Sequence, residues 1–234
     1  MNRYFFEHFI MMSWYTKDRR LTLFQIAAQL NVMMFSHVSA ILLCGGGSTR
    51  MGQDKGLINW EGRPLVLHMV EYLQTMFQEV LLVTGSRRRY ANLVDLPIYT
   101  DQIPNIGPLG GIYTGLLVSS NDWNLVIAYD MPCVRTALVT LLVEEIETKY
   151  KVIVPYVNGY FEPLLGLYHK DCLPEIERMI ATSNLKPIEL FWRVLTKVIP
   201  TEKLRQVDPH LISFLNINTQ EELRLASRTC PRNQ

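Results

Sequence analysis

The stretch 38–55, with the sequence VSAILLCGGGSTRMGQDK, decides the fold class of this 234-residue chain. Its first six residues form a largely apolar run of the kind that builds a buried strand. A turn that contains four glycines follows at once. Glycine readily adopts the positive-φ conformations that direct successive backbone N–H groups into one anion-binding concavity. Because Arg50 and Lys55 add positive charge there, the stretch predicts a strand that ends in a loop for the triphosphate of a nucleotide.

The glycine pattern differs from the two common phosphate-binding loops. A P-loop has Ser or Thr directly after its Gly-Lys pair, whereas Lys55 is preceded by Asp54 and followed by Gly56. A dinucleotide fingerprint has a third glycine where this chain has Arg50, and a helix opens directly from it. The turn therefore belongs to another class of nucleotide-binding loop.

Strand-like apolar segments alternate with segments of helical periodicity along the rest of the chain. Helices of about ten to fifteen residues between strands indicate right-handed crossovers and a mostly parallel sheet. A short link precedes the segment 163–168, so that strand is allowed to run antiparallel. The expected strands are 38–43, 80–83, 98–100, 125–129, 152–156, 163–168 and 211–215, and the expected helices are 64–76, 107–119, 134–148, 171–182 and 219–227.

Length and charge favour one large α/β domain. We expect it to span 36–230 and to follow an amino-terminal extension, 1–35, of unknown role. The extension lacks the order of basic, apolar and small residues that marks a cleavable signal, and we expect residues 1–33 to be dispensable for catalysis. A net charge of +1 provides no general field for recruiting nucleic acid or membrane.

The four cysteines are far apart and form no Cys-x-x-Cys pair. This spacing argues against a structural zinc site and predicts reduced thiols in the cytosol. No apolar run reaches about 18 uncharged residues, so we expect no transmembrane helix and a cytoplasmic protein.

Two aspartates follow expected strands. Asp101 comes after 98–100 and Asp130 after 125–129, and open α/β sheets bind ligands at the carboxyl ends of their strands. Mg²⁺ is typically held by one or two carboxylates plus substrate phosphates, so Asp130 is a candidate metal ligand. On local grounds alone, Asp130 also fits a cap of the helix that begins near 134, and Asp101 fits a turn residue.

These motifs resemble the nucleotidyltransferase signature Leu-x-Gly-Gly-x-Ser-x-Arg-Met-Gly-x-Asp-Lys. The paired Gly45-Gly46 and the ending Asp54-Lys55 are similar to those of the molybdenum cofactor guanylyltransferases, the MobA family. The segment 107–111 resembles the Gly-Pro-Leu-Ala-Gly motif of that family, and Asp130 lies in its Asp-x-Pro context. The resemblance covers 38–226.

The resemblance implies a Rossmann-like three-layer α/β sandwich with a mostly parallel sheet, as in nucleotide-diphospho-sugar transferases. It implies transfer of GMP from GTP to molybdenum-bound molybdopterin, with release of pyrophosphate and with Mg²⁺ held by Asp130. Lys55, Arg50 and Asp130 are the implied catalytic residues. The implied substrate-binding residues are Leu43, Cys44, Gly45, Gly46, Lys55, Asp101, Gly107, Pro108, Leu109, Asp130, Asn216 and Asn218.

The second substrate has its own candidate residues. The segment 161–164 (FEPL) resembles a family segment that faces this substrate, and Asn216 and Asn218 belong to a motif, Asn-x-Asn-Thr, that could hydrogen-bond a pterin. Lys186 lies where family members often place arginines for the phosphate of the pterin. Thr219 also fits a helix N-cap with Glu222 three residues on, a capping box. Molybdopterin-inserting proteins and molybdoenzyme chaperones are the implied protein partners.

Two alternatives stay open. A cytidylyltransferase of the same superfamily would share the fold and the chemistry, although Gly45-Gly46 and the segment 107–111 argue against it. A non-catalytic carrier or chaperone for molybdopterin belongs to a different class. Intact Lys55, Asp101 and Asp130 argue against this second alternative.

Overall fold

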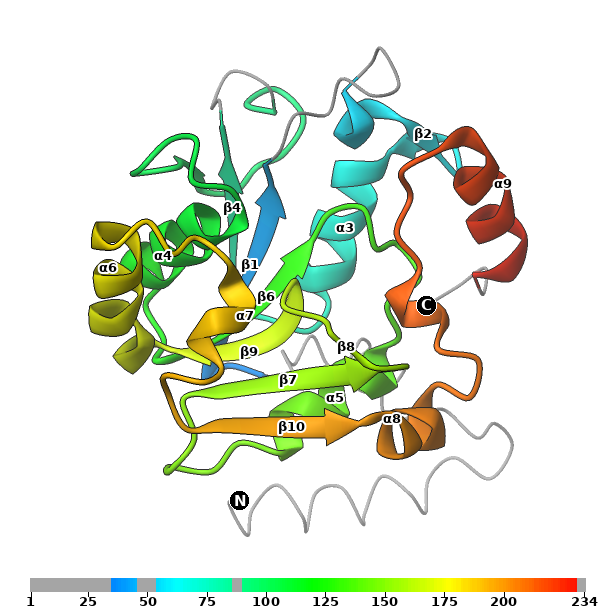
Figure 1. Cartoon of the computed structure of the whole chain (residues 1–234). Helices are drawn as coiled ribbons and strands as arrows, with labels where there is room; N and C mark the ends of the chain where they lie inside the picture. The colour runs from blue at the N-terminus through cyan, green and yellow to red at the C-terminus, as the bar shows by residue number, and fades with distance from the viewer. Residues whose placement is uncertain (1–34, 46–53, 86–89, 231–234) are drawn as a thin grey trace, which may run out of the picture. The chain divides into compact units, whose positions relative to one another are not determined.

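The structure is a computed structural model that describes residues 35–45, 54–85 and 90–230 (Figure 1). They belong to one compact unit, which begins at Phe35. Nearly all of the predicted extension lies outside the described residues, as do Gly46 and Arg50 of the glycine turn. The division into an extension and a domain that spans 36–230 therefore stays a prediction.

A mixed sheet of eight strands forms the centre of the described residues (Figure 1). Its strand order is β10-β7-β9-β6-β1-β4-β5, and β8 pairs with β7. β9 runs antiparallel to β6 and β7, while β4 and β6 run parallel to β1. The mostly parallel sheet and its antiparallel strand are therefore confirmed. The strands are β1 (Val38–Cys44), β4 (Glu79–Thr84), β5 (Ile98–Thr100), β6 (Trp123–Ala128), β7 (Val152–Val157), β8 (Tyr160–Phe161), β9 (Leu165–His169) and β10 (Thr196–Pro200).

β1 lies in the middle of the sheet, and all seven of its residues are buried. On one face, Ile41 and Leu43 share a core cluster with Ile112 of helix α4 and Ile176 of helix α6. Helix α3 contacts β1 and β4 and lies on the opposite side of the sheet (Figure 1). Burial on both faces explains why β1 reads as a continuous apolar run instead of an alternating one. The layers of helix, sheet and helix confirm the predicted α/β fold class.

The five predicted helices are confirmed, with ends that differ by a few residues. The helices are α3 (Leu65–Gln74), α4 (Pro108–Val118), α5 (Thr136–Glu144), α6 (Leu173–Ala181), α7 (Pro187–Leu190), α8 (Thr201–Val207) and α9 (Gln220–Thr229). Single 3₁₀ turns form η2 (Lys55–Leu57), η4 (Lys170–Cys172) and η5 (Ile212–Phe214), and β2 (Asn59–Trp60) pairs with β3 (Arg63–Pro64) in a small hairpin. No helix within the described residues is long and apolar enough to cross a membrane.

The predicted strand at 211–215 is wrong. Leu211 has a φ of 54°, and the residues after it form the 3₁₀ turn η5. Ser213 is fully buried, and its N–H donates to the Asp208 carboxylate at 2.8 Å. A short buried apolar run fits a strand and a helical turn equally well, so periodicity could not separate them. The edge strand β10, which pairs in parallel with β7, was not predicted.

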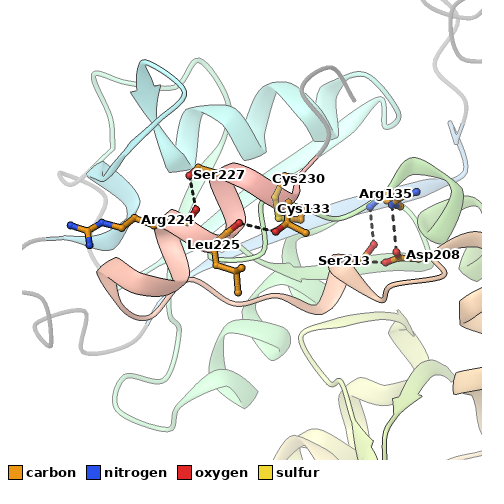
Figure 2. Close-up of a disulfide and its surroundings, with 9 residues drawn as sticks. Cys133, Arg135, Asp208, Ser213, Arg224, Leu225, Ser227 and Cys230 are labelled. Atoms are coloured by element: carbon orange, nitrogen blue, oxygen red, sulfur yellow. Dashed lines mark hydrogen bonds and ion pairs between the residues drawn. A yellow bond between two sulfur atoms is a disulfide. The ribbon is translucent and has the colours of Figure 1, made fainter.

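The prediction of reduced thiols is wrong for two of the four cysteines. Cys133 and Cys230 form a disulfide whose Cα atoms lie 5.2 Å apart, although 97 residues separate them in the chain (Figure 2). Helix α9 brings its carboxyl-terminal end back to the loop after β6, a juxtaposition that the spacing of cysteines along the sequence does not reveal. Cys44 and Cys172 are buried and are not disulfide-bonded.

Candidate active site

A cavity of about 570 Å³ lies at the carboxyl ends of β1, β4, β5 and β6. This volume is within the range of small-molecule sites, about 300–1,000 Å³. The edge of the sheet is also where open α/β folds bind their ligands. The cavity is lined by Leu43, Gly45, Val83, Gly85, Asp101, Pro104, Asn105, Gly107, Pro108, Gly111, Ala128, Tyr129, Asp130 and Leu164.

One wall of the cavity is formed by backbone. A Cβ atom at Gly111 of α4 would lie 3.0 Å from Cδ2 of Leu43 and 3.7 Å from Oδ1 of Asp101. The absence of a side chain at 111 therefore brings the helix backbone against β1 and beside a carboxylate. The Leu43 side chain therefore fills the space beside Gly111, whereas a Cβ atom at Gly45, Gly85 or Gly107 of the cavity lining would meet nothing within 4 Å.

Asp101 enters the cavity from the end of β5. Its N–H donates to the carbonyl of Thr84 at 3.3 Å, which continues the pairing of β5 with β4. Burial raises the pKa of the Asp101 carboxyl above its ordinary value. A carboxylate that has lost hydration in this way favours a ligand that supplies N–H donors.

Asp130 enters the same cavity from the end of β6. The N–H of the preceding Tyr129 donates to the carbonyl of Leu43 at 3.2 Å, so this loop continues the β6–β1 pairing. The pKa of Asp130 is raised, mainly by burial and further by Glu222, while the Lys55 ammonium opposes the shift. Asp130 is thus a partly desolvated carboxylate that a cation would stabilise.

Lys55 opens the 3₁₀ turn η2 and is only 8% exposed. Its Nζ donates to Oδ1 of Asn218 at 2.7 Å. The neighbouring Asp54 caps η2, because its Oδ1 accepts from the N–H of Gly56 at 3.0 Å. A lysine from the first third of the chain therefore meets the segment just before α9.

The segment before α9 is held at three points. Ile217 donates its N–H to the carbonyl of Asp130 at 2.8 Å, and Glu222 accepts the N–H groups of Asn218 and Thr219 at 2.7 and 2.8 Å. The predicted capping box at Thr219 and Glu222 is confirmed. These bonds fix the backbone of Asn218, whose side chain contacts Lys55.

The predicted site residues divide into three groups. The structure gathers Leu43, Gly45, Asp101, Gly107, Pro108 and Asp130 around the cavity, with Lys55 and Asn218 joined beside Asp130. Cys44 and Leu109 are buried in the core at 1% and 0% exposure, and Asn216 is exposed. Gly46 and Arg50 lie outside the described residues.

Sequence reasoning missed several residues of this site. Gly111 was predicted only as part of the segment 107–111, and Glu222 only as part of the capping box and not as a partner of the Asn218 N–H. Asn105, which has a φ of 65°, and Tyr90, which donates to Asp54, carried no local signal. Their roles depend on contacts between segments far apart in the chain.

The described part of the chain contains no group of three or more His, Cys, Asp or Glu side chains that could hold a metal ion. Mg²⁺ does not require such a group, since it is commonly held by one or two carboxylates and by substrate phosphates. Asp130 is the residue that could serve in this way, because its carboxylate is partly desolvated and lines the cavity.

Comparison with known proteins identifies the family to which this chain belongs. Residues 40–195 match the family described as "MobA-like NTP transferase domain". The chain belongs to this family. The prediction of a MobA-like nucleotidyltransferase is therefore confirmed, and the matched residues include every described residue of the cavity lining.

Relatives of this MobA-like chain agree with that assignment. A protein from Natranaerobius thermophilus, named "Probable molybdenum cofactor guanylyltransferase", is 32% identical over 200 residues, which cover 83% of this chain and 97% of the relative. The crystal structure of "Molybdopterin-guanine dinucleotide biosynthesis protein A" from Archaeoglobus fulgidus has a TM-score of 0.73 at 28% identity, covering 82% of this chain and 98% of that one.

A more distant structure shows the breadth of the fold. The 4-diphosphocytidyl-2C-methyl-D-erythritolsynthase from Anaerococcus prevotii has a TM-score of 0.57 at 16% identity, covering 82% of this chain and 95% of that one. At this identity the likeness concerns the fold alone. The MobA-like chain therefore shares its sandwich with enzymes whose names refer to other nucleotides.

Proposed function

We propose that this MobA-like nucleotidyltransferase transfers GMP from GTP to molybdenum-bound molybdopterin and releases pyrophosphate. The observation that carries the proposal is the cavity, which the carboxylates of Asp101 and Asp130 line together with several glycines. One part suits a base and the other suits phosphates. The names of the relatives support guanosine and molybdopterin as the substrates.

The base part of the cavity supports guanine over cytosine. The Watson–Crick edge of guanine presents a ring N–H and an amino group side by side, and these two donors match one carboxylate. Cytosine presents a single amino group next to acceptor atoms, which a carboxylate would repel. Asp101 therefore favours guanine, and Gly107, where a Cβ atom would meet nothing within 4 Å, leaves room for the ring.

The phosphates are proposed to lie near Asp130, which lines the cavity, and near Lys55, whose charge acts on Asp130. Lys55 would neutralise charge on the non-bridging oxygens of the triphosphate. Asp130 fits a Mg²⁺ ligand, and the bound ion would supply further charge neutralisation at the phosphates. Arg50, which lies outside the described residues, is proposed from the sequence to stabilise the leaving pyrophosphate.

The reaction needs no covalent enzyme intermediate. A phosphate oxygen of molybdopterin would attack the α-phosphorus of GTP while the bond from that phosphorus to the β-phosphate oxygen breaks. Catalysis then consists of positioning and of stabilising charge. Asn216 and the exposed side of Asn218 are proposed to contact the second substrate, and the protein partners and the cytoplasmic location stay predictions.

Calorimetric titration in the presence of Mg²⁺, with GTP, CTP, ATP and UTP in turn, tests the proposal. We expect selective binding of GTP, and a loss of about tenfold or more in Asp101→Ala or Lys55→Ala, because each removes a charged hydrogen-bonding group. Lys149→Ala is a matched control, since this exposed lysine pairs with Glu147 near the amino end of β7.

The other outcomes separate the alternatives. Preferential binding of CTP would keep the chemistry and replace GTP by a cytidine nucleotide. Binding of molybdopterin without any nucleotide binding would favour the carrier or chaperone. If GTP binds, formation of the guanine dinucleotide from molybdenum-bound molybdopterin is the decisive assay.

A further inference from the structure

Tyr90 lies outside the cavity lining, yet it contacts the turn that carries Lys55. It is only 1% exposed, and its hydroxyl donates to Oδ1 of Asp54 at 2.9 Å across 36 residues of sequence. The same Oδ1 accepts the N–H of Gly56 at 3.0 Å. Tyr90 and Gly56 therefore fix the Asp54 carboxylate from two directions.

The ring of Tyr90 also covers Gly56. A Cβ atom at 56 would lie 2.4 Å from the Tyr90 hydroxyl oxygen and 2.9 Å from Cζ, so only glycine fits under the ring in this arrangement. The backbone of η2 thus lies directly against an aromatic side chain. This close contact restricts the movement of the turn, because the Tyr90 ring lies directly against the backbone of Gly56.

The fixed turn determines where Lys55 points. Asp54 caps η2 with its side chain and accepts the N–H of Leu57 with its carbonyl at 3.0 Å. Lys55 is the first residue of that turn, and its Nζ ends at Asn218. Tyr90 thereby fixes the base of the lysine, while Asn218 fixes its tip.

The Tyr90 hydroxyl is well suited to donate to the Asp54 carboxylate. Burial raises its pKa far above the ordinary value, so the hydroxyl keeps its proton and remains a donor. A donor that never ionises suits a permanent bond to a carboxylate.

We propose that Tyr90 is a positioning residue for the nucleotide site: its hydroxyl locks Asp54, and through Asp54 the turn that presents Lys55 to the triphosphate. This inference rests on the proposed nucleotide-binding function but not on the identity of the base. A purely structural tyrosine would affect stability and leave nucleotide binding unchanged.

Tyr90→Phe provides the central test, because it removes the hydroxyl and keeps the ring over Gly56. We expect GTP affinity and kcat/KM for GTP to fall about tenfold, the scale of one hydrogen bond to a charged group. We expect the KM for molybdopterin to stay unchanged. Tyr72→Phe is the matched control, since it removes another buried tyrosine hydroxyl, on α3 and outside the cavity lining.

A double-mutant cycle with Lys55→Ala shows whether Tyr90 acts through the lysine. We expect Tyr90→Phe to cause little further loss of GTP affinity once Lys55 is absent, because coupled residues are not additive. Gly56→Ala is a second variant, since the added methyl group displaces the Tyr90 ring, and it should weaken GTP binding at least as much as Tyr90→Phe.

The outcomes distinguish this inference from the proposed function. If the wild-type protein binds no nucleotide, the function itself is contradicted. If wild type binds GTP, Lys55→Ala loses binding and Tyr90→Phe binds as wild type does, only the positioning role is overturned. Additive losses in the cycle would likewise overturn it, because Tyr90 would then act independently of Lys55.

Discussion

At the scale of single residues, two opposing effects act on the charge of Asp130. Burial disfavours the ionised form of Asp130, and the nearby Lys55 ammonium favours it. The hydrogen bond that holds Lys55 goes to a neutral amide oxygen, that of Asn218. Because this partner carries no charge, the hydrogen bond itself does not neutralise the ammonium.

The charge of Asp130 predicts a conflict between activity and stability. Its folded-state pKa is raised, so ionisation disfavours the folded state at every pH above that pKa. The penalty disappears as the pH falls below the unfolded value, about 3.9. We therefore expect Asp130→Asn to lower turnover about 100-fold or more, while raising Tm at pH 7 by about 2 °C or more.

Thermal unfolding from pH 4 to pH 8 checks this prediction. The gain in Tm of Asp130→Asn over wild type should shrink as the pH approaches 4. Glu144→Gln, a carboxylate at the end of α5 away from the cavity lining, is a control that should lack this trend. A lower Tm for Asp130→Asn at pH 7 would mean that the attraction to Lys55 outweighs burial.

At the scale of elements, α9 is a helix held mainly by its two ends. Of its ten residues only Ala226 is buried, and Leu225 is 53% exposed. The capping box and the bond from Ile217 to Asp130 hold its beginning, and the disulfide from Cys230 to Cys133 holds its end (Figure 2). The bond from Ile217 and the disulfide both lead to the loop after β6.

The disulfide predicts a large stability difference between oxidised and reduced protein. Its ends are 97 residues apart, and a cross-link over a long loop typically contributes about 2–4 kcal/mol, mainly by restricting the unfolded chain. Cys133→Ser with Cys230→Ser should therefore lower Tm by about 4–16 °C. Calorimetry of both proteins, with and without a dithiol reductant, measures the effect.

The reductant also supplies the control. It should lower the Tm of wild type to nearly that of the double variant, and it should leave the double variant unchanged. Equal Tm values for wild type with and without reductant would contradict a disulfide in solution. In a reducing cytosol, α9 would be held by the capping box and by Ile217.

The elements that could be predicted from sequence are those with local causes. β1 was predictable because seven consecutive buried residues need an apolar run, and α9 because Thr219 and Glu222 form a capping box. The segment 211–215 was not, because bonds to the distant Arg135 and the nearby Asp208 decide its turn (Figure 2). Sequence pattern carries little information about such contacts.

The same distinction applies to the candidate site. Asp101 and Asp130 were predictable because they come one and two residues after the end of a strand, where ligands of open α/β sheets bind. The contact of Lys55 with Asn218 crosses 163 residues, and that of Tyr90 with Asp54 crosses 36. Only the fold brings these pairs together, so single-residue patterns could not reveal them.

At the scale of the whole molecule, the cavity and the family match occupy the same part of the chain. Every described residue of the cavity lining lies between Leu43 and Leu164, and the family match begins at residue 40. The compact unit that contains them begins at Phe35. This unit contains Asp101 and Asp130 of the cavity lining, and it contains Lys55 with its partner Asn218.

A protein that starts at Met34 should therefore keep the fold and the site. We expect its GTP affinity to match that of the full chain within about twofold, a difference below about 0.5 kcal/mol. Phe35 sets the limit of truncation, because it is 7% exposed, its N–H donates to the carbonyl of Met76 at 3.0 Å, and its ring lies 5.5 Å from that of Phe77. A second protein that starts at His37 loses this buried ring and should be destabilised by about 3 kcal/mol or more. Calorimetric titration and thermal unfolding of the three proteins decide the matter, since a Met34 protein that folds but does not bind GTP would assign the first 33 residues a part in the site.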